Sequence, residues 1–351
     1  SYYPVNDIMP LQSTNDGHIV SGYDMNGVSE LMVKFDILGL RTLSVVDKTC
    51  NRIGIKMEDI DPNDEFIYKA FQVLDKPKGI FQVEADTNFK IAAQVKPRNL
   101  HQLSDCVALG RPGALAFVDR YAENVNSNED VSVHPFFSDI LNYTGGLPLY
   151  QEQLMKMANK VGFSLDEAEQ LRRIVGKKKV DQMPAWKAKI EEKIAENNLD
   201  KAIGDILWQV AEDSANYSFN LSHSISYSVL SAITVYLKFK YTKEFFLSLL
   251  DLALYEPNPI EEISVIAQEL QYFGIKLLPP DLSKSQMSFS IEGDNIRYGL
   301  NAIKGVSAKS LDNLIKFRGF QFNNIYDIFL TAKECKINIG VLCSLIQAGA
   351  L

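Results

Sequence analysis

The feature that most constrains the fold of this chain is a long stretch, residues 62–273, in which nearly every segment has a helical pattern. Segments with an apolar period of about 3.6 residues, or with strong helix formers, alternate with short clusters of Gly, Pro and Asn. The segments expected to be helical are 64–74, 97–109, 150–161, 165–176, 181–196, 200–213, 224–240 and 260–273. Helices with such short connections predict one large helical domain.

The residues on either side predict further domains. A chain of 351 residues is longer than one simple core usually supports, so two or three domains are expected. The composition changes near residue 277, where two prolines are followed by a hairpin pattern. The expected domains are residues 1–61, 62–276 and 277–351, and the predicted fold class is mainly α with a small β component.

An apolar run at residues 31–40 predicts a buried strand near the N-terminus. Its period places Val33 and Phe35 on one face and Lys34 and Asp36 on the other. Charges in such a strand are costly unless they are paired or bind a metal. A structural ion pair and a functional site both fit this pattern.

A dense basic run lies within the helical stretch, although the chain has a formal net charge of -8. Arg172, Arg173, Lys177, Lys178 and Lys179 are close neighbours that repel one another, and a polyanion would remove that cost. The arginines would lie on the flank of a helix and the lysines just past its end. This arrangement suits a triphosphate, and a solvated helix face is the alternative.

The residues before the run predict how its helix begins. Ser164 and Glu167 have the spacing of a capping box. Asp166 and Glu169 are expected to favour the helix start rather than to bind metal.

Two other segments contain candidate ligand-binding residues. Ser222 is the expected N-cap of an apolar helix, which places His223 in the first turn, where an anion is favoured. Arg111 lies between Gly110 and Gly113, so it could approach a backbone or a base closely. A structural histidine and an exposed loop arginine are the alternatives.

Residues 277–351 predict a DNA-binding module. Residues 287–291 and 296–300 form a hairpin pattern. A Gly-containing turn and an amphipathic helix follow, as in a helix-hairpin-helix, whose turn amides can hold a DNA phosphate without reading bases. The residues expected at this contact are Lys304, Gly305, Val306, Ser307 and Lys309. A second, weaker helical pair covers residues 325–351, and a helical hairpin that only packs is the alternative.

The sequence argues against several protein classes. It has no apolar run of about 18 residues and no charged-then-apolar leader, so neither a membrane span nor secretion is expected. The four cysteines are scattered, and neither they nor the four histidines have metal-ligand spacing. A cytoplasmic protein with reduced cysteines is expected.

Seven segments occur in the order typical of one family. They are residues 33–43, residues 79–84, Arg111-Pro112-Gly113, residues 150–155, Arg172-Arg173 with Gly176-Lys177-Lys178, Phe219-Asn220 with Ser222-His223, and residues 298–306. In these segments the chain resembles the C-family replicative DNA polymerases, that is, the α subunit of bacterial DNA polymerase III. One match would be weak, but seven in order are specific and extend over essentially the whole chain.

The resemblance implies a partial nucleotidyltransferase-like palm in residues 1–61, helical fingers in residues 62–276 and a tandem helix-hairpin-helix in residues 277–351. Family members extend a primer by attack of its 3′-hydroxyl on a deoxynucleoside triphosphate, with two Mg²⁺ ions held by three palm aspartates. By resemblance, Asp36 is the third aspartate and a metal ligand, and Lys34 is a catalytic residue that reaches the phosphates.

The resemblance also implies the partners, in a bacterial cell or a phage-infected bacterium. Primer-template DNA would be held by residues 304–309. The incoming dNTP would be bound by Arg111, Arg172, Arg173, Lys177, Lys178 and His223.

The chain departs from the family pattern in several places. The other two aspartates precede the third by many more residues than the 35 before Asp36. We therefore expect an N-terminal half with a phosphoesterase-like domain and these aspartates, and no activity without it. Replisome subunits are further expected partners. Gly110 stands where the family usually has Tyr, which removes a ring that could stack. Leu221 stands where the family has Lys, which removes a phosphate contact.

Two other functions fit these departures. One is a non-catalytic DNA- or nucleotide-binding protein, or a replication regulator, derived from such a subunit. In the other, only the hairpin module functions and the rest is scaffold.

Overall fold

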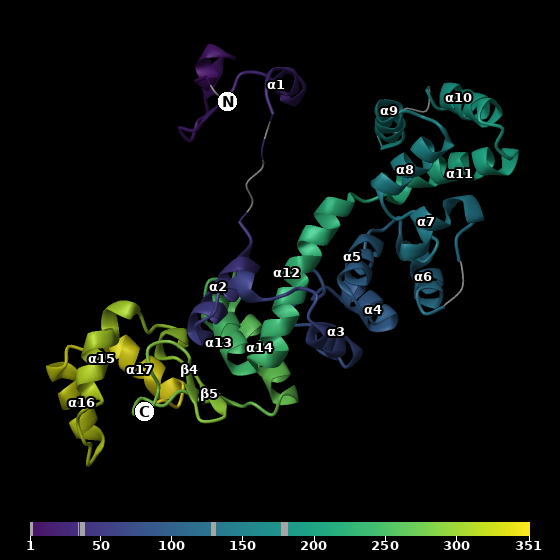
Figure 1. Cartoon of the computed structure of the whole chain (residues 1–351). Helices are drawn as coiled ribbons and strands as arrows, with labels where there is room; N and C mark the ends of the chain where they lie inside the picture. Colours follow the sequence, from purple (N-terminus) through teal and green to yellow (C-terminus); the bar gives the residue numbers. More distant parts are fainter. Residues whose placement is uncertain (1–2, 34, 36–38, 128–130, 177–181) are drawn as a thin grey trace. The chain divides into compact units, whose positions relative to one another are not determined.

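The computed structural model describes residues 3–33, 35, 39–127, 131–176 and 182–351. The chain forms two compact units, Ser1–Arg41 and Thr42–Leu351 (Figure 1). Helices dominate the described residues and the strands are short, which confirms a mainly α fold with a small β component. No helix in the described part of the chain is long and apolar enough to cross a membrane.

The described residues of the N-terminal unit form a 3-10 turn (Val5–Asp7), a short hairpin and an α-helix. Strands β1 (Leu11–Ser13) and β2 (Ile19–Ser21) pair antiparallel, and α1 (Met25–Leu31) follows. The Asp24 side chain accepts a hydrogen bond from the Gly27 N–H and so caps α1.

The buried strand expected at residues 31–40 is not formed by the described residues of that segment. Val33 and Phe35 are 74% and 83% exposed rather than buried. A strand needs a neighbour to accept and donate its backbone hydrogen bonds, and no described strand pairs with these residues. Lys34 and Asp36 lie outside the described residues.

The larger unit begins with a series of helices that confirms every helical segment expected between residues 62 and 273. The helices are α2 (Arg41–Ile53), α3 (Glu65–Gln72), α4 (Asp86–Val95), α5 (Leu100–Leu109), α6 (Val118–Asn124), α7 (Ser138–Leu141), α8 (Gln151–Val161), α9 (Leu165–Gly176), α10 (Met183–Glu196), α11 (Lys201–Tyr217), α12 (Leu221–Lys240), α13 (Thr242–Ala253) and α14 (Pro259–Tyr272).

Local capping fixes where two of these helices begin. The capping box of α9 is confirmed, because the Glu167 carboxylate accepts from the Ser164 N–H at 2.8 Å and Ser164 Oγ accepts from the Glu167 N–H at 3.2 Å. The expected N-cap Ser222 was wrong: Asn220 caps α12 by accepting from the His223 N–H at 2.8 Å. Asn is as good a cap as Ser, and the helix begins two residues earlier than an N-cap at Ser222 would give.

The helices pack around several separate cores. Helix α12 lies along α5 and α3 and then meets α13 (Figure 1). Helices α8 to α11 enclose a second core, in which α9 buries Ala168, Leu171 and Val175 at helical spacing. Helices α4, α5 and α6 pack together at a third.

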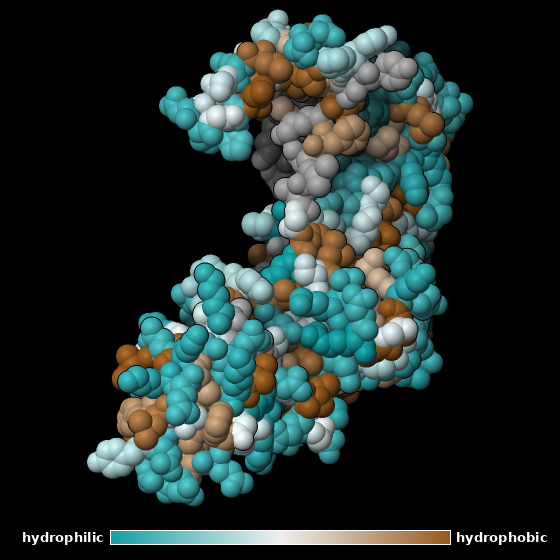
Figure 2. Space-filling model, turned by 90° about the vertical axis from the view of Figure 1, so that its left-hand side faces the viewer, coloured by the Kyte–Doolittle hydropathy of each residue, from teal (hydrophilic) through white to brown (hydrophobic). Residues whose placement is uncertain are grey.

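The C-terminal part of this unit contains the expected hairpin and helices. Strands β4 (Ser290–Glu292) and β5 (Asn295–Arg297) are antiparallel, and β3 (Leu277–Leu278) joins β5 in parallel. Helices α15 (Leu311–Phe317), α16 (Ile325–Glu334) and α17 (Ile339–Gln347) share one core with the turn before α15. On α16, the hydrophobic side chains of Tyr326 and Leu330 are exposed. Figure 2 shows hydrophobic and hydrophilic residues mixed at the lower end of the view.

Candidate functional site

Three segments that are far apart in the sequence line one cavity of about 380 Å³ in the larger unit. They are the turn before α4, the loop after α5 and the start of α12. The lining residues are Gln82, Asn88, Val107, Gly110, Arg111, Pro112, Phe219, His223 and Tyr227. Two of the predicted site residues, Arg111 and His223, therefore meet at one place.

A ladder of rings forms the aromatic wall of this cavity. His223 and Tyr227 are four residues apart on one face of α12, and Phe219 lies just before the N-cap Asn220 of that helix. Their ring centroids are 5.5 Å apart between Phe219 and His223, and 4.2 Å apart between His223 and Tyr227. The Arg111 guanidinium lies 4.8 Å from the centre of the Phe219 ring.

Arg111 is available to an anion. It is exposed, and it forms no ion pair with a carboxylate among the residues that the structure describes. A guanidinium that lines a cavity without an acidic partner offers its donors to a phosphate or carboxylate.

The N-terminus of α12 is already compensated by a protein carboxylate. The Glu152 side chain accepts from the Leu221 N–H and from Asn220 Nδ2, each at 3.0 Å. The Asn220 cap takes the His223 N–H. Because these amides are satisfied, we expect His223 to act through its ring rather than through the helix end.

The basic run is only partly available. Arg172 forms a two-bond pair with the Glu169 carboxylate, with both N–O distances at 2.6 Å, and Arg173 Nε contacts the same carboxylate at 2.7 Å. Hydrogen bonds from Arg172 and Arg173 lower the pKa of Glu169 to about 2. Glu169 was expected only to favour the helix start, so this pairing was missed. Lys177 and Lys178 lie outside the described residues.

A short chain of contacts joins Arg172 to the cavity wall. Arg172 Nη1 donates to Gln151 Oε1 at 3.1 Å, and the Gln151 N–H donates to the Phe219 carbonyl oxygen at 2.8 Å. The basic run and the aromatic ladder are thus connected through the start of α8.

A buried carboxylate that sequence analysis missed lies on α5, the helix that contributes Val107 to the cavity. Asp105 on α5 accepts from Tyr121 Oη at 2.5 Å and from Tyr150 Oη at 2.6 Å. Burial raises the pKa of Asp105 to about 7, although both hydrogen bonds oppose the shift. The three residues tie α5, α6 and the start of α8 together, and the Arg111 loop directly follows α5. An aspartate inside the apolar segment 103–109 was the available signal.

No cluster of three or more metal-ligating side chains occurs among the described residues. Asp36, the expected metal ligand, is outside them. The described residues therefore provide no group against which a magnesium site can be tested.

The predicted DNA contact forms a tight turn before α15. Gly305 has a φ of +93°, a conformation that favours glycine. Lys304, Ser307 and Lys309 are exposed, whereas the Val306 side chain is buried in the core of the module. The Val306 N–H donates to the Ile303 carbonyl oxygen at 3.0 Å, so Val306 supports the turn rather than offering a free donor to a phosphate.

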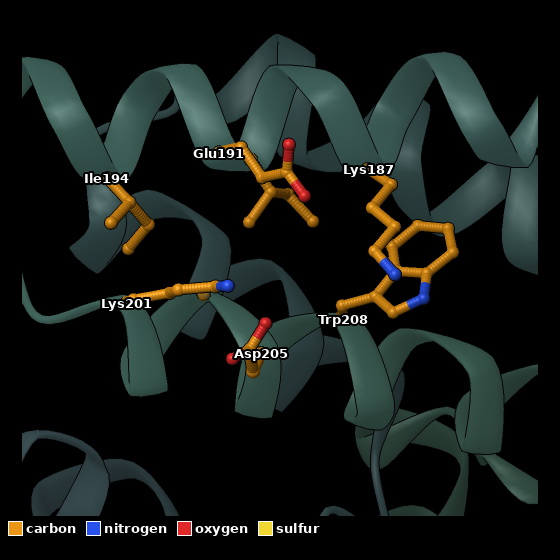
Figure 3. A pocket seen from close by; sticks show the side chains of 8 residues that line it. Lys187, Glu191, Ile194, Lys201, Asp205 and Trp208 are labelled. Carbon is orange, nitrogen blue, oxygen red and sulfur yellow. The ribbon is translucent and has the colours of Figure 1, made fainter.

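A second cavity, of about 300 Å³, lies between α10 and α11 (Figure 3). Lys187, Glu191, Lys201 and Asp205 surround it beside the Trp208 ring, so charges of both signs balance there. It includes none of the predicted site residues.

Comparison with known proteins adds two family matches. Residues 41–198 match the bacterial DNA polymerase III alpha subunit finger domain. Residues 274–351 match the helix-hairpin-helix motif.

Related sequences cover nearly the whole chain. It is 34% identical, over 365 aligned residues, to the DNA polymerase III subunit alpha of Thermus aquaticus. This alignment covers 99% of this chain and 30% of the relative. The corresponding protein of Campylobacter jejuni is 35% identical, over 97% of this chain and 29% of the relative. The protein of Bacillus subtilis is 30% identical, over 99% of this chain and 32% of the relative.

The chain thus spans about a third of the length of these relatives. The two matched regions include the loop with Arg111, the paired arginines and the turn before α15. The chain therefore belongs to the family of bacterial DNA polymerase III alpha subunits, and it corresponds to a part of such a subunit that includes the finger domain and the helix-hairpin-helix.

Proposed function

We propose that this chain binds the incoming dNTP at the cavity and primer-template DNA at the helix-hairpin-helix, as part of a DNA-directed DNA polymerase. The observation that supports this most directly is the meeting of Arg111, His223 and Phe219, from two distant segments, around one cavity. A nucleotide needs both a cation for its phosphates and flat surfaces for its base, and this cavity has both.

Arg111 is the proposed first contact for the triphosphate, because it has no competing carboxylate among the described residues. Arg172 and Arg173 would bind the triphosphate by exchanging Glu169 for phosphate oxygens. Lys177 and Lys178 belong to the same proposed set. Cations already in place where charge develops lower the barrier to phosphoryl transfer.

Catalysis would require the palm as well. We assign Asp36 to the metal site and Lys34 to phosphate contact, on the resemblance alone. One carboxylate does not hold two magnesium ions, so the other aspartates would come from a segment outside this sequence. Magnesium would supply charge stabilisation there, and the residues of this chain would orient the nucleotide.

The test is isothermal titration calorimetry. The unchanged chain and the variant Arg111→Ala are each titrated with a dNTP, and their affinities are compared. Losing one charge-assisted contact should weaken binding about tenfold or more. Arg120→Ala is the matched control, because Arg120 is exposed on α6 and does not line the cavity. Equal affinity of Arg111→Ala and the unchanged chain would refute the site.

A non-catalytic nucleotide- or DNA-binding role is the second candidate, and the pairing of Arg172 and Arg173 with Glu169 favours it. Primer extension in magnesium, with a candidate N-terminal half added, separates the two. Extension that is lost in Asp36→Ala supports the polymerase. Extension that survives this change rules out the catalytic assignment of Asp36.

A further inference from the structure

Gln82 lines the cavity in an unusual backbone conformation. Its φ is +60°, in the left-handed region, which has a steric cost for a residue other than glycine. The other described non-glycine residues with positive φ are Lys96, Asn198 and Lys336, and all three follow helix ends, where this conformation is common. Gln82 instead lies in the turn before α4, so something else must hold it.

Asn88 holds this turn. It is the third residue of α4, and its Nδ2 donates to the Gln82 carbonyl oxygen at 2.6 Å. Both side chains line the cavity. The Gln82 side-chain amide has no hydrogen-bond partner within the described ranges, so its donor and acceptor are available to a ligand.

Gly110 makes room for Asn88. A Cβ atom at position 110 would lie 2.1 Å from Asn88 Oδ1, far inside contact distance. The φ of Gly110 is -67°, which any residue adopts, so space rather than backbone conformation requires glycine here. The packing of α4 against α5 brings the two residues together.

We propose that Asn88 is a positioning residue that, with Gly110, holds Gln82 so that its amide recognises the nucleoside part of the bound nucleotide. Arg111 contacts the phosphates at the same cavity, so the two parts of the ligand are recognised by different residues. This inference rests on the proposed nucleotide binding. A side-chain amide suits the role because it pairs with a base edge or a sugar hydroxyl through one donor and one acceptor.

The test uses Asn88→Ala, Gly110→Ala and the double variant, with a dNTP and inorganic tripolyphosphate as separate probes. Asn88→Ala removes the donor to Gln82, and Gly110→Ala displaces the same side chain. Each change should weaken dNTP binding about tenfold, as expected for one lost hydrogen bond, and leave tripolyphosphate binding within about twofold. The double variant should be no weaker than either single one, because all three lose the same contact.

Asn88→Leu is the second variant, because it keeps a side chain of similar length and removes the donor without adding a charge to the cavity. Thermal melting confirms that each variant is folded. Equal losses for the dNTP and tripolyphosphate, or additive losses in the double variant, would overturn the positioning role. If the unchanged chain binds neither probe, the proposed nucleotide binding fails instead. If it binds the dNTP and the variants bind it equally well, only the role of Asn88 fails.

Discussion

Asp105 is the residue whose ionisation we expect to change stability around the cavity. Its pKa is raised from 3.8 to about 7 by burial, between Tyr121 and Tyr150. The folded state therefore binds the proton more tightly than the unfolded state, and the contribution of Asp105 to stability falls as the pH rises through this interval.

The measurement is urea unfolding between pH 4 and pH 8 for the unchanged chain and for Asp105→Asn. The difference in unfolding free energy between the two should change steadily up to about pH 7, and then level off. Other titrating groups are common to both proteins and cancel. A constant difference across this pH range would show that Asp105 is ionised in the folded chain throughout.

Glu169 is expected to restrain the basic run. Glu169→Gln keeps the shape of the side chain but removes the charge that pairs with Arg172 and Arg173. Because the freed guanidiniums then offer their donors to phosphate, tripolyphosphate should bind about three- to tenfold more tightly at low salt.

Glu167→Gln is the matched control for this change. Glu167 lies on the same helix, carries the same charge and bonds to Ser164 instead of to an arginine. Isothermal titration calorimetry measures the tripolyphosphate affinity of both variants and of the unchanged chain. An equal gain in both would mean that net charge alone is responsible, and no gain in Glu169→Gln would remove Arg172 and Arg173 from the site.

Among the elements, α12 anchors the turn that carries Gln82. Lys238 on α12 is fully buried, pairs with Glu269 on α14, and donates to the Lys76 and Lys78 carbonyl oxygens at 2.6 and 2.8 Å. Glu269 in turn accepts from the Lys78 N–H at 3.1 Å. The residues just before the turn are therefore fixed to two helices at once.

Breaking this buried pair should be costly. Glu269→Ala leaves the Lys238 charge buried without its carboxylate, and we expect a loss of about 3–5 kcal/mol in unfolding free energy. The double change Lys238→Met with Glu269→Leu should recover most of that loss, because no charge remains buried. Urea unfolding measures both. A loss of the same size in the double variant would mean that the hydrogen bonds of this pair to the Lys76 and Lys78 backbone, rather than its charge, hold these elements.

An element can be predicted from the sequence when residues within the element itself determine where it begins and ends. Helix α9 begins and ends where its pattern indicated, because its capping box is a local signal. Helix α13 was not predicted, since Phe245, Phe246, Leu249 and Leu250 are buried on more than one side and leave no clear period.

The same reasoning applies to the site. Arg111 and His223 stand in short motifs and could be predicted from the sequence. The contact of Asn88 with Gln82 and the pairing of Glu169 with two arginines depend on tertiary packing or rotamers, and no local pattern marks them. The apolar segment with Val33 and Phe35 shows the converse, because a strand pattern forms no strand without a partner strand.

For the whole molecule, charge is distributed unevenly with respect to the proposed DNA contact. The chain has a formal net charge of -8, but residues 277–351 contain eight Lys and Arg against six Asp and Glu. Duplex DNA repels a protein that is acidic overall, so non-specific affinity must come from this local basic excess. Amides of the turn that are not bonded within it would add contacts that carry no charge.

Lys304→Ala should therefore weaken duplex binding and make the remaining binding less dependent on salt. A lysine that contacts one phosphate contributes close to one unit to the slope of log affinity against log salt concentration, so the slope should fall by about 1. Fluorescence anisotropy with a short duplex over a range of salt concentrations measures this. Lys333→Ala is the control, because Lys333 is exposed on α16 of the same module and outside the turn. Identical slopes for the two variants would place the DNA contact elsewhere, and a slope that falls only in Lys304→Ala would place it at the turn before α15.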